Sequence, residues 1–480
     1  MRVVAGLALA LVAALLPLNQ ALAVTDAPAV SRDHTLDLRD AYLSGGAWSA
    51  RGFGAASSRP SDPANGSGEF FWDPAAPRAR ECGPAVCLHY VTTTSDAPPL
   101  SAADGVTPDW VRRNLEVTEF TLTRMAELGY PTVPSDAGRG DSAQFDVYLA
   151  DISRAGLYGY CAPEAPVPGA PGHASSYCVF DNDFGGFPMP ADESLRVTAA
   201  HELSHAVQFG MDVREDRWFL ESSATWMEEQ VADDVDDNRQ YLSAGQLGRR
   251  TVSLDHAAAD LGIYGNWIFF QFLAQRYGVD AIRQIWSRAD AAPGLRDDYS
   301  IEAVRHFVES RGHTFPSVYA AFVRANLSPH RGYDEGSAYR AARLDDSVRL
   351  GPRRSTWRDA GIGVSHLTSR AVAFRPQAGL RGSPKLRLSV SATRGSGAAA
   401  SAQVFLRSGG VTNLPIKLKR GEGSRVVKFA GSRVRKVVVV LANASTRYDC
   451  DQRTQFACQG MPRDEAQRFG LAATVVRARR

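Results

Sequence analysis

Two histidines four residues apart, with an acidic residue between them, form the clearest chemical pattern in the chain. They occur in the run His201-Glu202-Leu203-Ser204-His205. On a helix, residues four apart lie on the same face, so the two imidazoles can point at one metal ion. Glu202 then lies beside them, where its carboxylate can reach a water on that ion. The pattern predicts a metal centre here, and a purely structural helix is the alternative.

The flanking sequence predicts that this run lies on a buried helix. Pro188 and Pro190 precede it, Asp192 can cap its start, and Gly210 can end it. Residues 195–200 are mostly small or apolar, as a helix packed inside a domain requires.

A catalytic zinc site needs a third protein ligand. A metzincin would have a glycine three residues after His205 and a histidine six residues after it, but those places hold Gln208 and Met211. The other candidates are the acidic residues that follow the motif, namely Asp212, Glu215, Asp216, Glu221, Glu228 and Glu229. Residues 218–229 are typical of a second helix, and the preceding turn is long enough to fold it back against the first.

This second helix carries the pattern W-x-x-E-x-x-A-x-W-x-E, starting at Trp218. Together with the histidine pair, it resembles the gluzincin metallopeptidases and a group of secreted bacterial zinc metalloproteases that carry a C-terminal β-sandwich. The resemblance implies that Glu221 is the third zinc ligand and that Glu202 is the general base for a zinc-activated water. His205 and Glu221 are 221 − 205 = 16 residues apart, which is shorter than the thermolysin-like spacing.

Other residues could support this chemistry. Thr225 and Glu228 lie on the same helical face as Glu221 and could hold the ligands in place, although an ordinary polar face is equally compatible with them. Some gluzincins use a tyrosine or a histidine to bind the oxyanion, which makes Tyr264 and His256 candidates by resemblance. Packing is the alternative for both.

The preceding elements fit the zincin plan of strands followed by the motif helix. Residues 87–94 and 145–152 predict strands, and 107–128 predict a helix. By resemblance, Gly156–Tyr160 is the edge that pairs with extended substrate, with a plain edge strand as the alternative. Residues 162–177 predict a Pro- and Gly-rich loop at the rim of the cleft. Further helices are predicted at 264–277, 280–286, 300–310 and 315–326.

The C-terminal part reads as an all-β module. From residue 361 onward, helical periodicity gives way to regularly spaced strands, which predicts a jelly-roll-like sandwich. Residues 361–449 hold sixteen Lys or Arg residues and two acidic ones, although the formal net charge of the whole chain is only +2. Such a module could bind an anionic polymer of the cell envelope, or it could simply present a solvated face.

The ends of the chain and its cysteines indicate export. Residues 1–23 predict a secretory signal peptide, with cleavage after Ala23. The six cysteines fall in close pairs, which predicts the local disulfides Cys82–Cys87, Cys161–Cys178 and Cys450–Cys458. We expect a secreted protein with no membrane span and no nucleic-acid partner. The acidic run 233–237 and residues 181–183 are weak calcium candidates, for which a solvated loop is the better interpretation.

We therefore expect an α+β chain with a zincin-like domain at 82–330, made of a mixed sheet, an active-site helix and a helical lower half. A linker is predicted at 331–360 and the β-sandwich at 361–480. Residues 24–81 are an N-terminal extension or a propeptide. The expected function is a secreted Zn²⁺ metallopeptidase acting on peptides or proteins. The alternatives are a degenerate peptidase fold that binds the cell envelope or polysaccharide through its basic sandwich, and a zinc hydrolase with a non-peptide substrate.

Overall fold

Alternating side chains in the first half of the chain build a mixed five-stranded sheet. The computed structural model describes residues 34–44, 58–62, 70–257, 260–395 and 397–476. The strands of the sheet are β1 (Arg78–Cys82), β2 (Val86–Val91), β3 (Phe145–Ala150), β4 (Gly159–Val167) and β5 (Ala170–Asp181). Their order is β1-β2-β3-β5-β4. β2, β3 and β5 are parallel, whereas the outer strands β1 and β4 run antiparallel to their neighbours.

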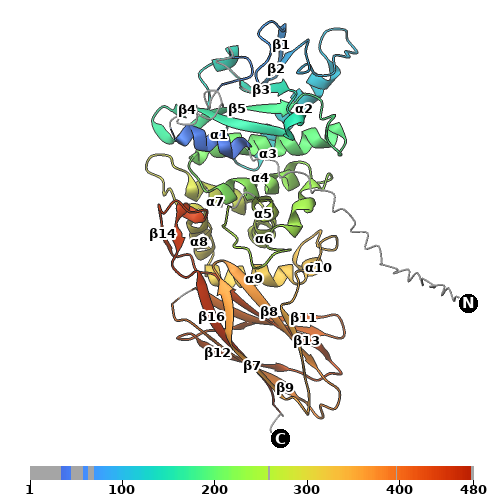
Figure 1. Ribbon diagram of the computed structural model, residues 1–480, viewed down its shortest axis with the longest axis vertical. Helices are drawn as coiled ribbons and strands as arrows, with labels where there is room; N and C mark the ends of the chain where they lie inside the picture. Colours follow the sequence, from blue (N-terminus) through green and yellow to red (C-terminus); the bar gives the residue numbers. More distant parts are fainter. Residues whose placement is uncertain (1–33, 45–57, 63–69, 258–259, 396, 477–480) are drawn as a thin grey trace, which may run out of the picture. The chain divides into compact units, whose positions relative to one another are not determined.

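The two faces of this sheet pack on different parts of the chain. Val147 and Leu149 of β3 face the main core, against α2 (Asp109–Glu127) and α3 (Ala191–Asp212), which lie along one face in Figure 1. Tyr148 belongs to a second core on the opposite face. This alternation is the period-two pattern of a strand that is buried on both sides.

Part of the predicted N-terminal extension belongs to the domain. Trp72 is buried in the second core and donates its indole N–H to the carbonyl of Leu149. The guanidinium of Arg59 is buried, and it forms ion pairs at 2.5–2.6 Å with Asp136, Asp146 and Glu164. The described residues 58–62 and 70–81 are therefore an integral layer of the fold. The predicted signal peptide 1–23 lies outside the described residues.

β4 and β5 form a hairpin. The two-residue connection between Val167 and Ala170 includes Gly169, whose φ of 80° suits a residue without a Cβ atom. Cys161 and Cys178 face each other across the two strands and form a disulfide. The prediction of a loop at 162–177 was therefore wrong, because proline and glycine are tolerated at the outer edge of a sheet.

A helical half follows the sheet. Its helices are α4 (Arg217–Val231), α5 (Gly262–Gly265), α6 (Trp267–Tyr277), α7 (Asp280–Ala289), α8 (Ser300–Ser310), α9 (Phe315–Asn326) and α10 (Pro329–Gly332). A 3₁₀ segment, η4 (Asp237–Ser243), connects α4 to this group. The predicted helix at 264–277 is split into α5 and α6.

The C-terminal module is a β-sandwich, as predicted. Its strands are β6 (Asp346–Leu350), β7 (Thr356–Ser365), β8 (Thr368–Pro376), β9 (Lys385–Ala392), β10 (Ala398–Leu406), β11 (Val411–Ile416), β12 (Glu422–Lys428), β13 (Val434–Asn443) and β16 (Ala466–Val476). One sheet has the order β11-β10-β13-β8-β6 and the other β12-β9-β16-β7. With β6 set aside, this alternation between the two sheets is the strand order of a jelly roll. The predicted linker 331–360 was too long, because β6 and β7 already belong to the sandwich.

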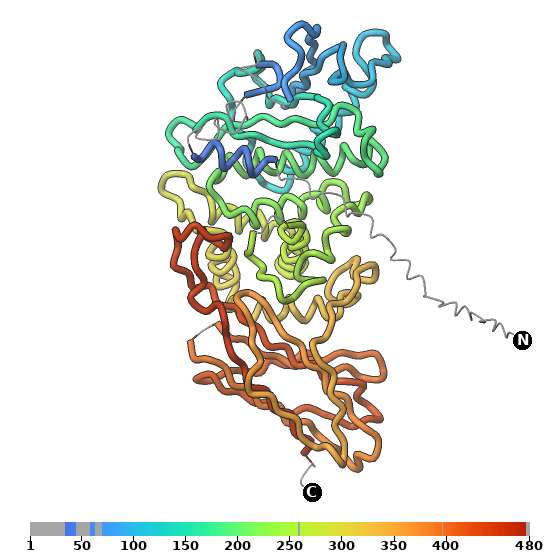
Figure 2. Tube along the Cα trace, in the orientation of Figure 1, coloured from blue at the N-terminus to red at the C-terminus, as the bar shows by residue number. Residues whose placement is uncertain are grey.

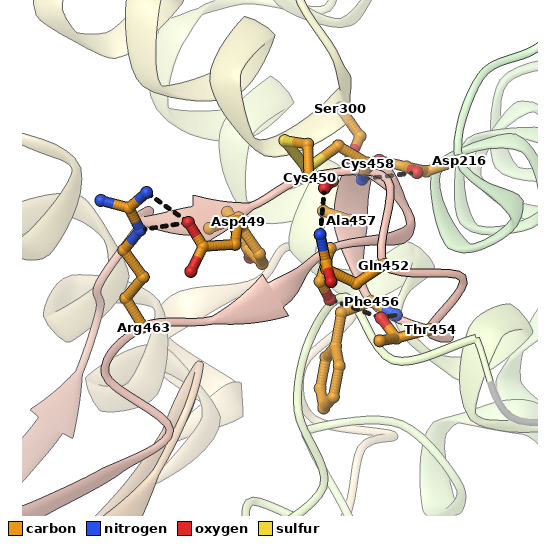
Figure 3. Close-up of a disulfide and its surroundings, with 12 residues drawn as sticks. Asp216, Ser300, Asp449, Cys450, Gln452, Thr454, Phe456, Ala457, Cys458 and Arg463 are labelled. Atoms are coloured by element: carbon orange, nitrogen blue, oxygen red, sulfur yellow. Dashed lines mark hydrogen bonds and ion pairs between the residues drawn. A yellow bond between two sulfur atoms is a disulfide. The ribbon is translucent and has the colours of Figure 1, made fainter.

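The sandwich is joined closely to the helical half. The sheet that contains β13 packs its outer face on α9, and Val438 and Val440 belong to the same core as the helices. Figure 3 shows a second connection, at the loop closed by the Cys450–Cys458 disulfide. The backbone N–H of Cys458 donates to the carboxylate of Asp216, the residue immediately before α4.

All three predicted disulfides are present, at Cys82–Cys87, Cys161–Cys178 and Cys450–Cys458. Among the described residues, no helix combines the length and the apolar composition needed to cross a bilayer.

Candidate metal centre

α3 brings the two motif histidines together on one of its faces. The imidazole rings of His201 and His205 lie one helical turn apart, and their centroids are separated by 4.9 Å. The helix is buried along most of its length and runs to Asp212, two residues beyond the predicted stop at Gly210. At Gly210 a Cβ atom would lie 2.5 Å from the Pro134 ring, so the glycine is required by close packing.

Glu221 of α4 reaches both imidazoles. Its Oε2 lies 3.1 Å from His201 Nε2, and its Oε1 lies 3.4 Å from His205 Nε2. The candidate ligand atoms of the three residues all lie within 4.8 Å of one another. The structure therefore brings together the three residues that the sequence singled out as zinc ligands.

The other nitrogen of each ring is held by a separate side chain. The Nδ1–H of His201 donates to Glu228 Oε1 at 2.8 Å, and the Nδ1–H of His205 donates to Gln208 Oε1 at 2.8 Å. Gln208 in turn donates its amide to the Leu220 carbonyl and to Ser223 Oγ on α4. Such partners fix the orientation of an imidazole and leave Nε2 as the ligand atom.

The cluster suits a metal ion. His205 Nε2 and Glu221 Oε1 are buried and have no hydrogen-bond partner, which is costly unless something binds them. Two imidazoles and one carboxylate form a ligand set typical of catalytic zinc. Glu221 and His205 are fully buried, whereas the side chain of His201 is 12 % exposed, so the cluster is open to solvent at His201.

The electrostatics of the cluster reflect its buried charges. Burial favours a neutral imidazole, but the hydrogen bonds with Glu221 and Glu228 raise the pKa of His201 well above its usual value. Burial acts against the charge of Glu221 as well, yet the two imidazoles hold its pKa well below the usual range. Both shifts indicate that this position favours positive charge between the imidazoles and the carboxylate, which a bound cation would also supply.

Glu202 lies beside the cluster and is nearly buried. Burial raises the pKa of its carboxyl group, and the neighbouring imidazoles oppose this rise. Its Oε2 accepts a hydrogen bond at 3.1 Å from the hydroxyl of Thr35. Thr35 lies on α1 (His34–Leu43), a helix that precedes the sheet by many residues. A carboxylate in such a position can accept and return a proton.

β4 passes directly over this part of α3. A Cβ atom at Gly159 would lie 2.7 Å from Thr198 Cγ2 and 3.0 Å from Glu202 Cγ. The residue must therefore be glycine for the strand to approach the helix so closely. Among the described strands β4 pairs only with β5, and its other edge faces α1 (His34–Leu43). The predicted substrate edge 156–160 overlaps the start of β4.

Of the two oxyanion candidates, only Tyr264 is found at the centre. Its ring stacks on His201 with centroids 5.7 Å apart. The sequence did not indicate a role for Tyr241 of η4, but its ring centroid lies 5.3 Å from that of Tyr264. Burial, together with the charges of Glu228 and of a second acid on η4, raises the pKa of Tyr241 well above its usual value. His256 packs instead on Phe456 of the C-terminal loop.

The remaining acidic residues that follow the motif have other partners. Asp216 accepts hydrogen bonds from Ser300 Oγ and from the C-terminal loop. Glu215 accepts a hydrogen bond from the backbone N–H of Ser300. The hydroxyl of Thr225 donates to the backbone carbonyl of Glu221 and so does not hold the ligand side chain, whereas Glu228 contacts His201 as expected.

The two weak calcium candidates are largely engaged with protein groups. In the run 233–237, Asp234 pairs with Arg196 and Asp236 pairs with Arg239. Asp181 accepts backbone N–H groups from four residues, namely Ile152, Ser153, Asp183 and Phe184. Asp233 does approach Glu229 and Glu335 closely enough to share a cation, but it is exposed.

Two residues of the centre could not have been assigned a role from the motif alone. In the sequence, Gln208 was used only to exclude the metzincins. Its spacing of three residues from His205 was the one signal that its side chain could contact that imidazole. Thr35 lies 167 residues before Glu202, and no local pattern connects the two.

Comparison with known proteins adds one family match. A family of unknown function, DUF6055, matches residues 180–319, a range that includes all the candidate ligands. No curated protein matches the chain.

Solved structures give weak likenesses. The pre-peptidase C-terminal domain of a Bacillus anthracis collagenase has 12% identity and a TM-score of 0.16, over 28% of this chain and 98% of the other. The Aeromonas hydrophila lysozyme inhibitor PliG has 12% identity and a TM-score of 0.15, over 27% and 99%. A GH115 4-O-methyl-α-glucuronidase specific for decorated arabinogalactans has 9% identity and a TM-score of 0.14. This match covers 62% of this chain and less than half, 46%, of the other.

Proposed function

We propose that the chain is an exported zinc metallopeptidase with a zincin-like, gluzincin-type catalytic domain. One observation carries the proposal: the Nε2 atoms of His201 and His205 converge on the Glu221 carboxylate, while both Nδ1 atoms are held by other side chains. A structural salt bridge would not require two oriented imidazoles around one fully buried acid. Three disulfides also favour an oxidising compartment, as expected if residues 1–23 are a signal peptide.

His201, His205 and Glu221 would hold the metal. When bound, zinc supplies a Lewis acid that lowers the pKa of water and polarises a carbonyl. Glu228 and Gln208 keep the imidazoles in the orientation and tautomer that present Nε2.

The residues around the ligands would then perform the proton transfers and the positioning. Glu202, whose pKa is raised by burial, accepts a proton from the attacking water and returns it to the leaving amine. Tyr264, stacked on His201, is placed to steady negative charge on the substrate oxygen. The edge of β4 that faces away from β5 would bind an extended peptide next to Glu202.

The test measures zinc content and peptide cleavage in parallel. Purified chains with intact disulfides are assayed for bound zinc, and a mixed peptide library is read by mass spectrometry. We expect Glu202→Gln to keep zinc and lose nearly all turnover, because it removes only the proton acceptor. We expect Glu221→Ala to lose zinc. Cleavage is measured on the intact chain and on a chain cut between Ser44 and Ser58, because Thr35 holds Glu202 in the intact chain.

Glu215→Gln is the matched control, since Glu215 is a buried acid near the start of the helix that carries Glu221 and accepts the backbone N–H of Ser300 instead of contacting the imidazoles. Retained turnover in Glu202→Gln would remove the general base from the mechanism. Full zinc in Glu221→Ala would move the third ligand to another acid. Zinc binding without cleavage of any peptide would favour a non-peptide substrate.

A second candidate function rests on the basic sandwich. The outer face of one sheet is covered by α9, which leaves the sheet β12-β9-β16-β7 as the open face. On that face Lys385 of β9 lies directly opposite Lys428 of β12, and Arg387 follows two residues along β9. Like charges placed opposite each other across strands are destabilising, and all three of these side chains are exposed.

We propose that this cationic face binds an anionic polysaccharide of the cell envelope. The test is sedimentation of the full chain with insoluble polygalacturonate, with a neutral polysaccharide as reference. A triple charge reversal at Lys385, Arg387 and Lys428 should abolish a salt-sensitive interaction. The control reverses three exposed cations elsewhere on the sandwich, namely Arg381, Lys417 and Arg433. Equal losses in both variants would mean that only the net charge matters.

A further inference from the structure

One hydroxyl group connects helix α1 to two functional parts of the candidate site. Thr35 Oγ donates to Glu202 Oε2 at 3.1 Å and accepts the backbone N–H of Cys161 at 3.0 Å. Glu202 is the proposed general base, and Cys161 belongs to the edge strand β4. Figures 1 and 2 show α1 running beside β4 and α3, although both of these elements come much later in the sequence.

The orientation of β4 explains why this contact matters. Cys161 and Cys178 face each other with Cα atoms 4.0 Å apart, the short spacing of a pair that exchanges no backbone hydrogen bonds. The N–H of Cys161 therefore points away from β5, towards the free edge. An extended peptide that added to this edge would need that N–H. In the structure, Thr35 already uses it.

α1 is attached on both sides of the candidate centre. Towards the sheet, His34 packs edge-to-face on Tyr160 of β4, with centroids 4.6 Å apart. Towards the helical half, Arg39 donates to the backbone carbonyl of Glu215, and Asp40 pairs with Arg217 at 2.6 Å. Arg217 is the first residue of α4, the helix that carries the third ligand. The helix therefore spans from the edge strand to the ligand helix.

A helix of this kind depends on its surroundings. α1 has only ten residues, and helices shorter than roughly 12 residues are marginal in water by themselves. Leu36 and Ala41 are buried against the rest of the chain. Its helical form is therefore maintained by the contacts at the site.

We propose that α1 is an intramolecular inhibitor that keeps the peptidase latent by occupying the substrate edge and holding Glu202. This proposal rests on the proposed function. Hydrolysis of one peptide bond between Ser44 and Ser58 would separate α1 from the domain. The segment after that cut stays attached, because the buried Arg59 is bound by three carboxylates.

The first experiment releases α1 without removing any other part of the chain. Residues 47–53 are replaced with the recognition sequence of a site-specific protease, and cut and uncut forms are compared. We expect zinc content to be equal and peptide cleavage to rise at least about tenfold after cutting, the scale of releasing one hydrogen bond to a charged group. Equal cleavage rates would overturn the proposal while leaving the peptidase intact. Absence of zinc from both forms would instead overturn the proposed function.

Point variants test the named contact in the uncut chain. Thr35→Val keeps the shape of the side chain and removes the bridge to Glu202 and Cys161, so cleavage should rise several-fold. Ser44→Ala is the control on the same segment, since its hydroxyl donates to the Ala41 carbonyl within α1; its rate should stay at the uncut level. An unchanged rate in Thr35→Val would show that the bridge does not restrain the base.

A binding measurement separates inhibition from a structural role. A fluorescent library peptide is titrated into the inactive Glu202→Gln chain, and anisotropy should show binding only after the cut. A synthetic peptide of residues 32–44 should inhibit the cut enzyme, and its Thr35→Val form should inhibit less. Loss of cooperative unfolding after cutting would make α1 a structural element and overturn the proposal.

Discussion

Replacing Gln208 by leucine tests whether the side chains around the ligands prepare the site for metal. In the structure the Gln208 carbonyl accepts the Nδ1–H of His205, and its amide donates to the Leu220 carbonyl and to Ser223 Oγ. Leucine has nearly the same size and removes all three interactions. We expect zinc to bind more weakly and the fold to lose part of its stability.

The structure indicates how large each effect should be. Ser223 keeps a partner because it also accepts the indole N–H of Trp286, so the imidazole of His205 is the main group left unpaired. One buried unsatisfied group costs about 1–3 kcal/mol of unfolding free energy. Without Gln208 the imidazole can also carry its proton on Nε2, the atom that faces Glu221. Loss of such a partner lowers metal affinity by about 10- to 100-fold, or about 1.4–2.7 kcal/mol.

The assay combines urea unfolding of the metal-free chain with zinc titration against a chromophoric chelator. Gln271→Leu is the matched control, because Gln271 is also a buried glutamine that bonds α4, through Trp226. We expect both variants to lose stability and only Gln208→Leu to lose affinity. Wild-type affinity in Gln208→Leu would refute the idea that Gln208 sets the tautomer. Equal affinity losses would point to a general displacement of α4.

Two further predictions concern stability. Burial, with repulsion from Asp297, raises the pKa of Asp212 to about 7. The stability that this group contributes is therefore complete below about pH 4 and is lost as the pH rises through about 7. The unfolding free energy measured in urea should fall between about pH 4 and pH 7, and it should fall less in Asp212→Asn. Replacing Cys450 and Cys458 with serine frees the loop that docks at Asp216 and should lower the unfolding free energy by about 2–3 kcal/mol. An unchanged urea midpoint would show that the docked loop adds nothing to stability.

The candidate ligands could be predicted because their geometry is local. His201 and His205 meet through helical periodicity alone, which any sequence of this spacing would share. Glu221 required a resemblance, since a residue on a second helix is brought near only by the turn between α3 and α4. Thr35 had no such signal, because its contact with Glu202 depends on how a separate segment packs into the finished domain.

The errors in the fold have a related cause. The sequence did not predict the hairpin of β4 and β5, because its prolines and glycines suggest a loop. In the structure, the pairing of β4 with β5 and the disulfide between the two strands keep this segment extended. The sandwich was predicted to start at residue 361, which is too late, because β6 is a short strand that joins the sheet by pairing with β8. Arg59 lies in the segment predicted to be an N-terminal extension or propeptide, yet its three carboxylate partners come from distant parts of the domain.

The contacts of α4 connect the sandwich to the candidate centre. Asp216 stands immediately before α4 and accepts hydrogen bonds from Ser300 and from Cys458 in the C-terminal loop. One turn further along the helix, Glu221 is held against both imidazoles, and Glu228 supports the first of them. Because a helix of this length is rigid over its roughly four turns, displacement of its start would move both acids relative to α3. The C-terminal loop therefore does more than close the sandwich, because it also contacts the start of the helix that carries the candidate ligand Glu221.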